Sequence, residues 1–161
     1  MTDFRSLIRV LAEAQIEFII VGGAAATAHG SARLTEDLDI VYRRTPDNVA
    51  RLARVLAPYQ PYLRGAPSGL PFSWDEHTVW RGLNFTLTTS LGAIDLLGEI
   101  TGGGNYDDLQ PDAVQLQLYG VQCLCLSLER LIQGKRAAGR PKDLEAIAEL
   151  EAILEERRGQ S

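Results

Sequence analysis

Two predicted strands, connected through a pair of glycines and a short helix, constrain the fold of this chain more than any other feature. Residues 17–21 form an apolar run that predicts a buried strand, and the run ends at Gly22 and Gly23. Alanine dominates residues 24–29, a composition that predicts a short helix. In residues 37–42 apolar and acidic side chains alternate, so a second strand follows after a loop. This order of elements indicates an α+β domain.

The rest of the chain continues the alternation of helices and strands. Apolar spacing predicts a first helix over about residues 3–14, and Thr45 followed by Pro46 marks the start of another. The Pro/Gly-rich residues 58–76 predict a long loop or lid. Further strands are predicted at 84–88, 93–100, 114–118 and 121–126, a flexible turn at 101–105, and helices from Ser127 and from about Pro141, the last with Leu144, Ile147, Leu150 and Leu154 on its inner face. We therefore expect one α+β domain over residues 1–161, with a mostly mixed sheet flanked by helices and with helices at its C-terminal end.

The composition excludes several classes of protein. With 161 residues, 45% hydrophobic and 23% charged, the chain can bury a core, which argues against disordered and fibrous proteins. A net charge of -5 argues against a protein that coats DNA. No stretch is long and apolar enough to span a membrane, and the N-terminus has no pattern of a signal peptide, so we expect a cytoplasmic protein.

Three carboxylates are the strongest candidates for chemistry. Asp37 and Asp39 lie two apart on a predicted strand, so both side chains leave the same face, about 6.5 Å apart. Two such carboxylates repel each other, and a divalent cation would relieve the repulsion. Oxygen ligands favour Mg²⁺, with Mn²⁺ as a substitute. Asp95 lies in an apolar run, AIDLL, and a neighbouring strand with the other two acids would explain this lone charge.

The pattern of Gly22-Gly23, a short helix, Arg33-x-Thr35 and Asp37-Leu-Asp39 resembles the DNA polymerase beta-like nucleotidyltransferase superfamily. Within it, the chain is similar to minimal bacterial members, including abortive-infection-type nucleotidyltransferases of toxin–antitoxin systems. Asp95 is similar to the family's third acid. Residues 134–150 resemble the basic C-terminal motif of such members, at Lys135, Lys142 and Asp143.

The resemblance implies transfer of a nucleoside monophosphate from a nucleoside triphosphate (NTP) such as ATP. Asp37, Asp39 and Asp95 would be the catalytic, metal-binding residues, with two Mg²⁺ ions. The nucleotide-binding residues would be Gly22, Gly23, Arg33, Thr35, Lys135 and Lys142. From this resemblance we expect a nucleotidyltransferase-like domain with its catalytic core at about residues 15–100 and a helical segment at about 127–158.

Several alternatives stay open at this stage. The acceptor would be a tRNA or other RNA, a protein or a small molecule, and a cognate toxin or antitoxin protein is an expected partner. Lys135 and Lys142 are equally compatible with a solvated surface, and Asp143 with the first turn of the last helix. A different class of function is a binding module that keeps the fold with little or no turnover, as one partner of a two-protein system.

Overall fold

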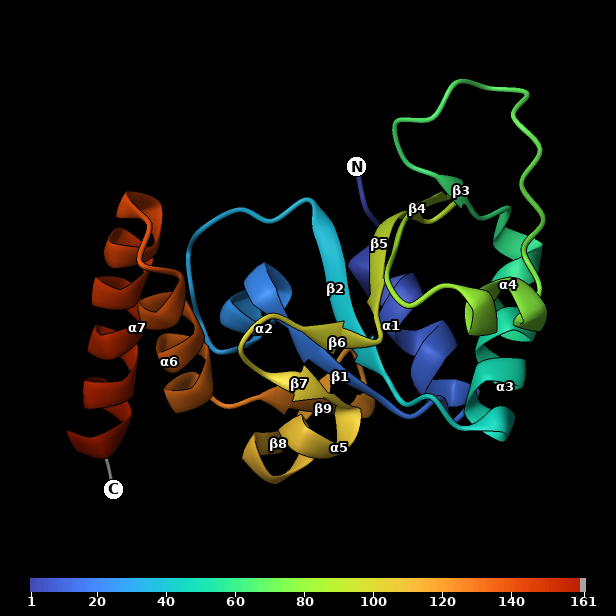
Figure 1. Ribbon diagram of the computed structural model, residues 1–161. Coiled ribbons are helices and arrows are strands. Elements are labelled where there is room, and N and C mark those ends of the chain that lie inside the picture. Colours follow the sequence, from blue (N-terminus) through green and yellow to red (C-terminus); the bar gives the residue numbers. More distant parts are fainter. Residues whose placement is uncertain (160–161) are drawn as a thin grey trace.

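The computed structural model of the protein describes residues 1–159 and shows a mixed sheet flanked by helices (Figure 1). Within these residues the main sheet has seven strands in the order β3-β4-β5-β2-β1-β9-β8, and β6 and β7 form a separate two-stranded sheet. The strands are β1 Phe18–Val21, β2 Asp37–Tyr42, β3 Tyr62–Leu63, β4 Phe85–Thr89, β5 Gly92–Leu97, β6 Glu99–Ile100, β7 Gly104–Asn105, β8 Ala113–Leu118 and β9 Val121–Leu126. The predicted α+β fold with a mixed sheet is confirmed.

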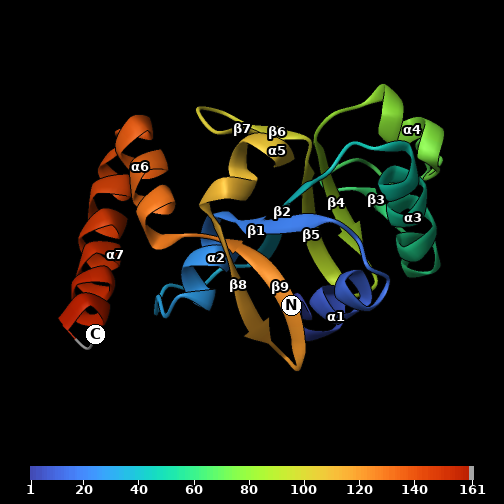
Figure 2. The ribbon, with the colours of Figure 1, turned by 90° about the horizontal axis from the view of Figure 1, so that it is seen from below.

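The helices cover the two faces of the sheet unequally. Figure 2 shows α1 and α2 on one side of the sheet, and α5 with the β6–β7 hairpin on the other. Helices α6 and α7 form a helical hairpin beyond α2. The helices are α1 Phe4–Glu13, α2 Gly22–Ala28, α3 Pro46–Leu56, α4 Glu76–Arg81, α5 Tyr106–Leu109, α6 Leu128–Ala138 and α7 Pro141–Gly159, with 3-10 turns at Ala57–Tyr59 and Gln110–Asp112. No helix in the described part of the chain is long and apolar enough to cross a membrane.

Strand β2 is amphipathic and lies at the centre of the fold. It pairs antiparallel with β1 and parallel with β5. Leu38, Ile40 and Tyr42 project from one face of β2 and are fully buried in the core. Asp37 and Asp39 project from the opposite face, because successive side chains of a strand alternate. Burial of the apolar face fixes the register, and the register fixes where the acids lie.

The structure corrects four sequence expectations. Residues 58–76 are not only a loop, because β3 lies within them and pairs with β4. The strand predicted at 93–100 ends at Leu97, because the chain turns at Gly98, whose N–H is held by Leu83 O and by Asn84 Oδ1. The predicted turn at 101–105 contains β7. Leu144 is 60% exposed and does not lie on the inner face of the last helix, while Ile147 and Leu150 do.

The C-terminal helix is tied to α2 through His29, the residue after the last turn of α2. The His29 ring is buried, and its Nε2 lies 2.8 Å from Leu126 O. Arg157 donates to His29 O and lies 3.0 Å from His29 Nδ1. Since Arg157 can only donate, Nδ1 must accept and Nε2 must carry the proton, so this arrangement requires a neutral imidazole.

We predict that this neutral imidazole makes stability depend on pH. Burial, and secondarily the Arg157 charge, lower the pKa of His29 below 6.5, although its bond to Leu126 O and the nearby Glu129 act in the opposite direction. A lowered folded-state pKa contributes stability above about pH 6.5 that is lost as pH falls. The melting temperature of the native protein should therefore fall more steeply from pH 7.5 to 5.5 than that of His29→Gln. Parallel curves for the two proteins would contradict this assignment.

Candidate active site

Three carboxylates converge at one end of the sheet, on the face of β2 and β5 opposite to Leu38 and Ile40. The parallel register aligns Asp39 with Asp95 and Asp37 with Ala93, so all three acids project from the same face of β2 and β5. Each is partly buried, and one oxygen of each lies within 4.8 Å of one from each of the others. The sequence predicted this adjacency only from the lone charge in the apolar run around Asp95.

Asp39 lies in the least favourable position for a charged group. Burial first, and then the neighbouring Asp95 and Asp37, raise its pKa to about 7, although the charge of Arg64 acts in the opposite direction. Its Oδ1 is buried without a hydrogen-bond partner. A buried, unpartnered carboxylate oxygen among like charges needs either a proton or a cation.

Arg64 supplies part of the missing positive charge, a role that no pattern in the sequence indicated. Its N–H continues the β3–β4 ladder by donating to Thr86 O at 3.0 Å. Its guanidinium lies 2.8 Å from Asp95 Oδ1 and 3.3 Å from Asp37 Oδ2. The contact with Asp95 Oδ1 lacks hydrogen-bond geometry, so it is a close charge contact rather than a directed bond.

Gly22 and Gly23 bring the first turn of α2 against the acids. Gly22 has a φ of +63°, and a Cβ at this position would collide with the carboxylate of Asp39. A Cβ on Gly23 would lie 2.9 Å from Thr35 Oγ1. Thr35 in turn donates to Asp37 O at 3.2 Å. The glycines therefore permit a close approach between α2, the loop before β2 and the acids.

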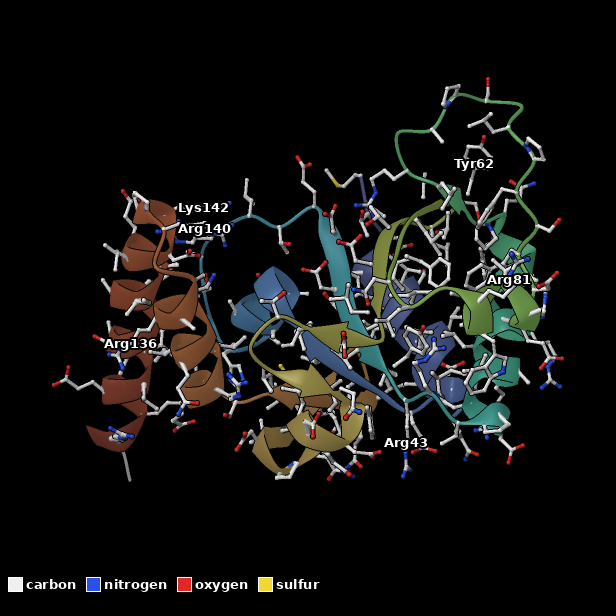
Figure 3. All side chains as sticks on the ribbon, viewed as in Figure 1. Arg43, Tyr62, Arg81, Arg136, Arg140 and Lys142 are labelled. Carbon is white, nitrogen blue, oxygen red and sulfur yellow. The ribbon has the colours of Figure 1, made fainter. Side chains whose placement is uncertain are left out.

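The predicted nucleotide-binding residues do not all lie together. Gly23, Arg33, Thr35 and Lys135 line one small cavity of about 140 Å³ between α2 and the α6–α7 hairpin. Lys142 does not line this cavity, and its side chain is exposed near the start of α7 (Figure 3).

Two of these cations also have acidic partners within the protein. Arg33 lies 3.6 Å from Glu149, and Lys135 lies 4.0 Å from Asp143. Asp143 is buried, and Arg140 lowers its pKa by a side-chain hydrogen bond. Asp143 therefore lies in the first turn of α7, as its alternative interpretation predicted, and its ion pair with Arg140 holds the α6–α7 turn.

The three acids fit a divalent cation. Ligand oxygens of an octahedral Mg²⁺ lie at about 2.1 Å from the ion, and hence about 3–4.2 Å from one another. The oxygens of Asp37, Asp39 and Asp95 need only small shifts from their separation of up to 4.8 Å to reach this range. The unpartnered Asp39 Oδ1 is an available ligand atom. An all-oxygen donor set is suited to Mg²⁺ or Mn²⁺.

The sequence has no significant match among protein-family profiles or curated proteins. Solved structures, in contrast, share the fold. The lincosamide antibiotic adenylyltransferase LnuA, solved with lincomycin bound, has a TM-score of 0.60 at 15% identity over 94% of this chain and 96% of its own. ANT(2")-Ia in complex with adenylyl-2"-tobramycin has a TM-score of 0.56 at 14% identity, over 97% of each chain. An antigenic nucleotidyltransferase-like protein from Paracoccidioides brasiliensis has a TM-score of 0.56 at 17% identity, over 92% of this chain and 75% of its own. The chain therefore has the fold of nucleotidyltransferases.

We predict that Gly22→Ala destabilises the protein more than Gly139→Ala does. The two glycines have nearly equal φ values, +63° and +65°, so both variants lose about 1 kcal/mol to backbone strain. Only at Gly22 does the added Cβ also meet a carboxylate, whereas the nearest atom at Gly139 is 3.8 Å away. Urea unfolding of both variants measures the difference, and equal losses would show that the Asp39 carboxylate moves aside freely.

Proposed function

We propose that this protein is a divalent-metal-dependent nucleotidyltransferase that transfers a nucleoside monophosphate from an NTP to a hydroxyl group. One observation is central to the proposal: Asp37, Asp39 and Asp95 converge beside Gly22 on a fold shared with nucleotidyltransferases. A purely structural role gives no reason for three acids, one with an unpartnered buried oxygen, on one face of a sheet.

The resemblance to nucleotidyltransferases, together with the convergence of the three acids, suggests a role for each. Asp37 and Asp39 would hold two divalent metal ions, and Asp95 would bind one of them and accept the proton of the attacking hydroxyl. Bound Mg²⁺ would neutralise the charge of the triphosphate and of the transition state. The hydroxyl oxygen forms a bond to the α-phosphorus, the bond from that phosphorus to pyrophosphate breaks, and the proton passes to Asp95. The raised pKa of Asp39 shows that the acids already lie in surroundings that favour an added cation.

The nucleotide would be bound at the entrance to α2. Because Gly22 and Gly23 have no side chains, the first turn of α2 lies directly beside the acids, and its backbone would bind the triphosphate there. Arg33, Thr35 and Lys135 lie around the adjoining cavity, so Arg33 and Lys135 supply positive charge for the triphosphate. Lys142 is exposed and lies outside that cavity, which makes it the weakest of the nucleotide-binding assignments.

A small-molecule alcohol is the acceptor class that the comparisons favour. Two similar structures are antibiotic adenylyltransferases or carry an adenylylated antibiotic. The sheet face beside the acids is accessible as well, because Thr86 and Thr88 of β4 are exposed there. An RNA or protein acceptor, and a role within a toxin–antitoxin pair, rest on the sequence resemblance alone.

Incubation with each α-³²P-labelled NTP, Mg²⁺ and either lincosamides, aminoglycosides, tRNA or cell extract would identify the labelled acceptor.

We predict that Asp39→Asn and Asp95→Asn each lower transfer by about a thousandfold or more, in line with losses of groups that stabilise transition-state charge. Their melting temperatures without metal should stay unchanged or rise, because each variant removes a repelling charge from the cluster. Steady-state rates and thermal melts measure both effects. Asp47→Asn, at an exposed position in the first turn of α3, is the matched control and should keep full activity. Full activity of either cluster variant would refute the assignment.

Mg²⁺ and an NTP together should raise the melting temperature more than the sum of their separate effects. Metal and triphosphate share ligands, so each favours binding of the other. Thermal shifts with each of the four NTPs would also identify the preferred base. A shift that is insensitive to every NTP would favour the binding-module alternative.

A further inference from the structure

The guanidinium of Arg64 lies where a metal ion would be bound. It contacts Asp95 Oδ1 at 2.8 Å and Asp37 Oδ2 at 3.3 Å, two of the three proposed metal ligands. These contacts are sheltered, because the Arg64 side chain is only 27% exposed. A guanidinium and a divalent ion repel each other, so they cannot share the same carboxylates at these distances without a large energetic cost.

The sheet itself delivers Arg64 to this position. Antiparallel pairing places Thr86 beside Asp95, and Arg64 N–H is bonded to Thr86 O. Arg64, Thr86, Asp95 and Asp39 therefore form one row across β3, β4, β5 and β2. The guanidinium is further fixed by Leu87 O, which accepts from its Nη2 at 2.7 Å.

We propose that Arg64 is an intramolecular competitor of the metal: it holds the acids together in the absence of metal, and the metal must displace it. This inference rests on the proposed metal site. Three carboxylates with Arg64 alone leave a net negative charge, so the contacts of Arg64 with Asp95 and Asp37 reduce the repulsion without cancelling it. The competitor thus lowers repulsion among the acids in the absence of metal and weakens metal binding.

The surroundings of Arg64 allow the side chain to leave without disruption of the fold. Gly65 follows it at a φ of +81° with no atom near its missing Cβ. The base of the next loop is held independently by Tyr62, labelled in Figure 3, whose hydroxyl donates to Pro67 O at 2.5 Å and accepts from Leu70 N. Phe72 packs edge-on against the Tyr62 ring. A change of the Arg64 rotamer that breaks the bond to Leu87 O would therefore uncover the acids while Tyr62 holds the loop.

Binding of Mn²⁺ without nucleotide, measured by electron paramagnetic resonance, tests the proposal. Arg64→Met should bind Mn²⁺ at least tenfold more tightly than the native protein, and Arg64→Lys should bind with nearly native affinity because the charge remains. Arg64→Gln keeps a donor for Leu87 O, so it serves if the Met variant does not fold. Arg81→Met removes the same charge from an exposed residue of α4, at a distance from the acids (Figure 3), and should leave Mn²⁺ affinity unchanged.

The same proteins give a second measurement that an unrelated structural role would not change. Without metal, Arg64→Met should melt at a lower temperature than the native protein, and Mn²⁺ should raise its melting temperature by the larger amount. Unchanged or weaker Mn²⁺ affinity in the Met and Gln variants would overturn the proposal, as would an absence of Mn²⁺ binding in all of the proteins. Tighter binding in Arg64→Met without nucleotidyl transfer by any protein would support the competitor and refute the proposed function.

Discussion

The rest of the structure depends on β2, whose apolar side chains must be buried in the core while its two acids, on one face, repel each other. Its apolar side chains are fully buried, and this burial fixes the pairing of β2 with β1 and β5. The same register places Asp37, Asp39 and Asp95 together on the other face, where they repel one another. Hydrophobic burial on one face thus maintains an electrostatic arrangement on the other that would not form by itself. Ionisable groups held in such unfavourable electrostatic surroundings are expected at a functional site.

Local signals in the sequence predicted the elements that create this arrangement. The strand with Asp37 and Asp39 was predicted at its observed bounds, and the helix start at Thr45 and Pro46 is confirmed, because a side-chain cap and a first-turn proline act within one turn. The predicted helix after the glycines instead begins at Gly22 itself. The adjacency of β2 and β5 was inferred only from the lone charge of Asp95 in an apolar run, which a neighbouring strand with the other two acids would explain.

Arg64 was not predictable, because its role depends on contacts far apart in the sequence. It follows a strand of only two residues, between Pro61 and Gly65, which leaves too few positions for an alternating pattern. Its partners are 27 and 31 residues away, on strands whose order only the folded sheet reveals. At Leu144, by contrast, the sequence predicted a buried residue that the structure does not have. Leu144 fits the helical period but faces solvent, while the charged Asp143 is buried beside Arg140. Periodicity cannot show that a turn between two helices needs an ion pair at its centre.

The shortness of β3 has a consequence for how such a protein can diversify. Only Tyr62 and Leu63 pair with β4, and the loop beyond them leaves the body of the protein (Figure 1). The tip of this loop can therefore lengthen, shorten or change in sequence without altering the register of β2 and β5, since loops tolerate insertions far better than the strands that they connect. Its far end is anchored by Trp74, which donates to Ala53 O. Sequence changes in this segment would alter the surface next to Arg64 and the three acids, while the acids themselves would remain under separate selection.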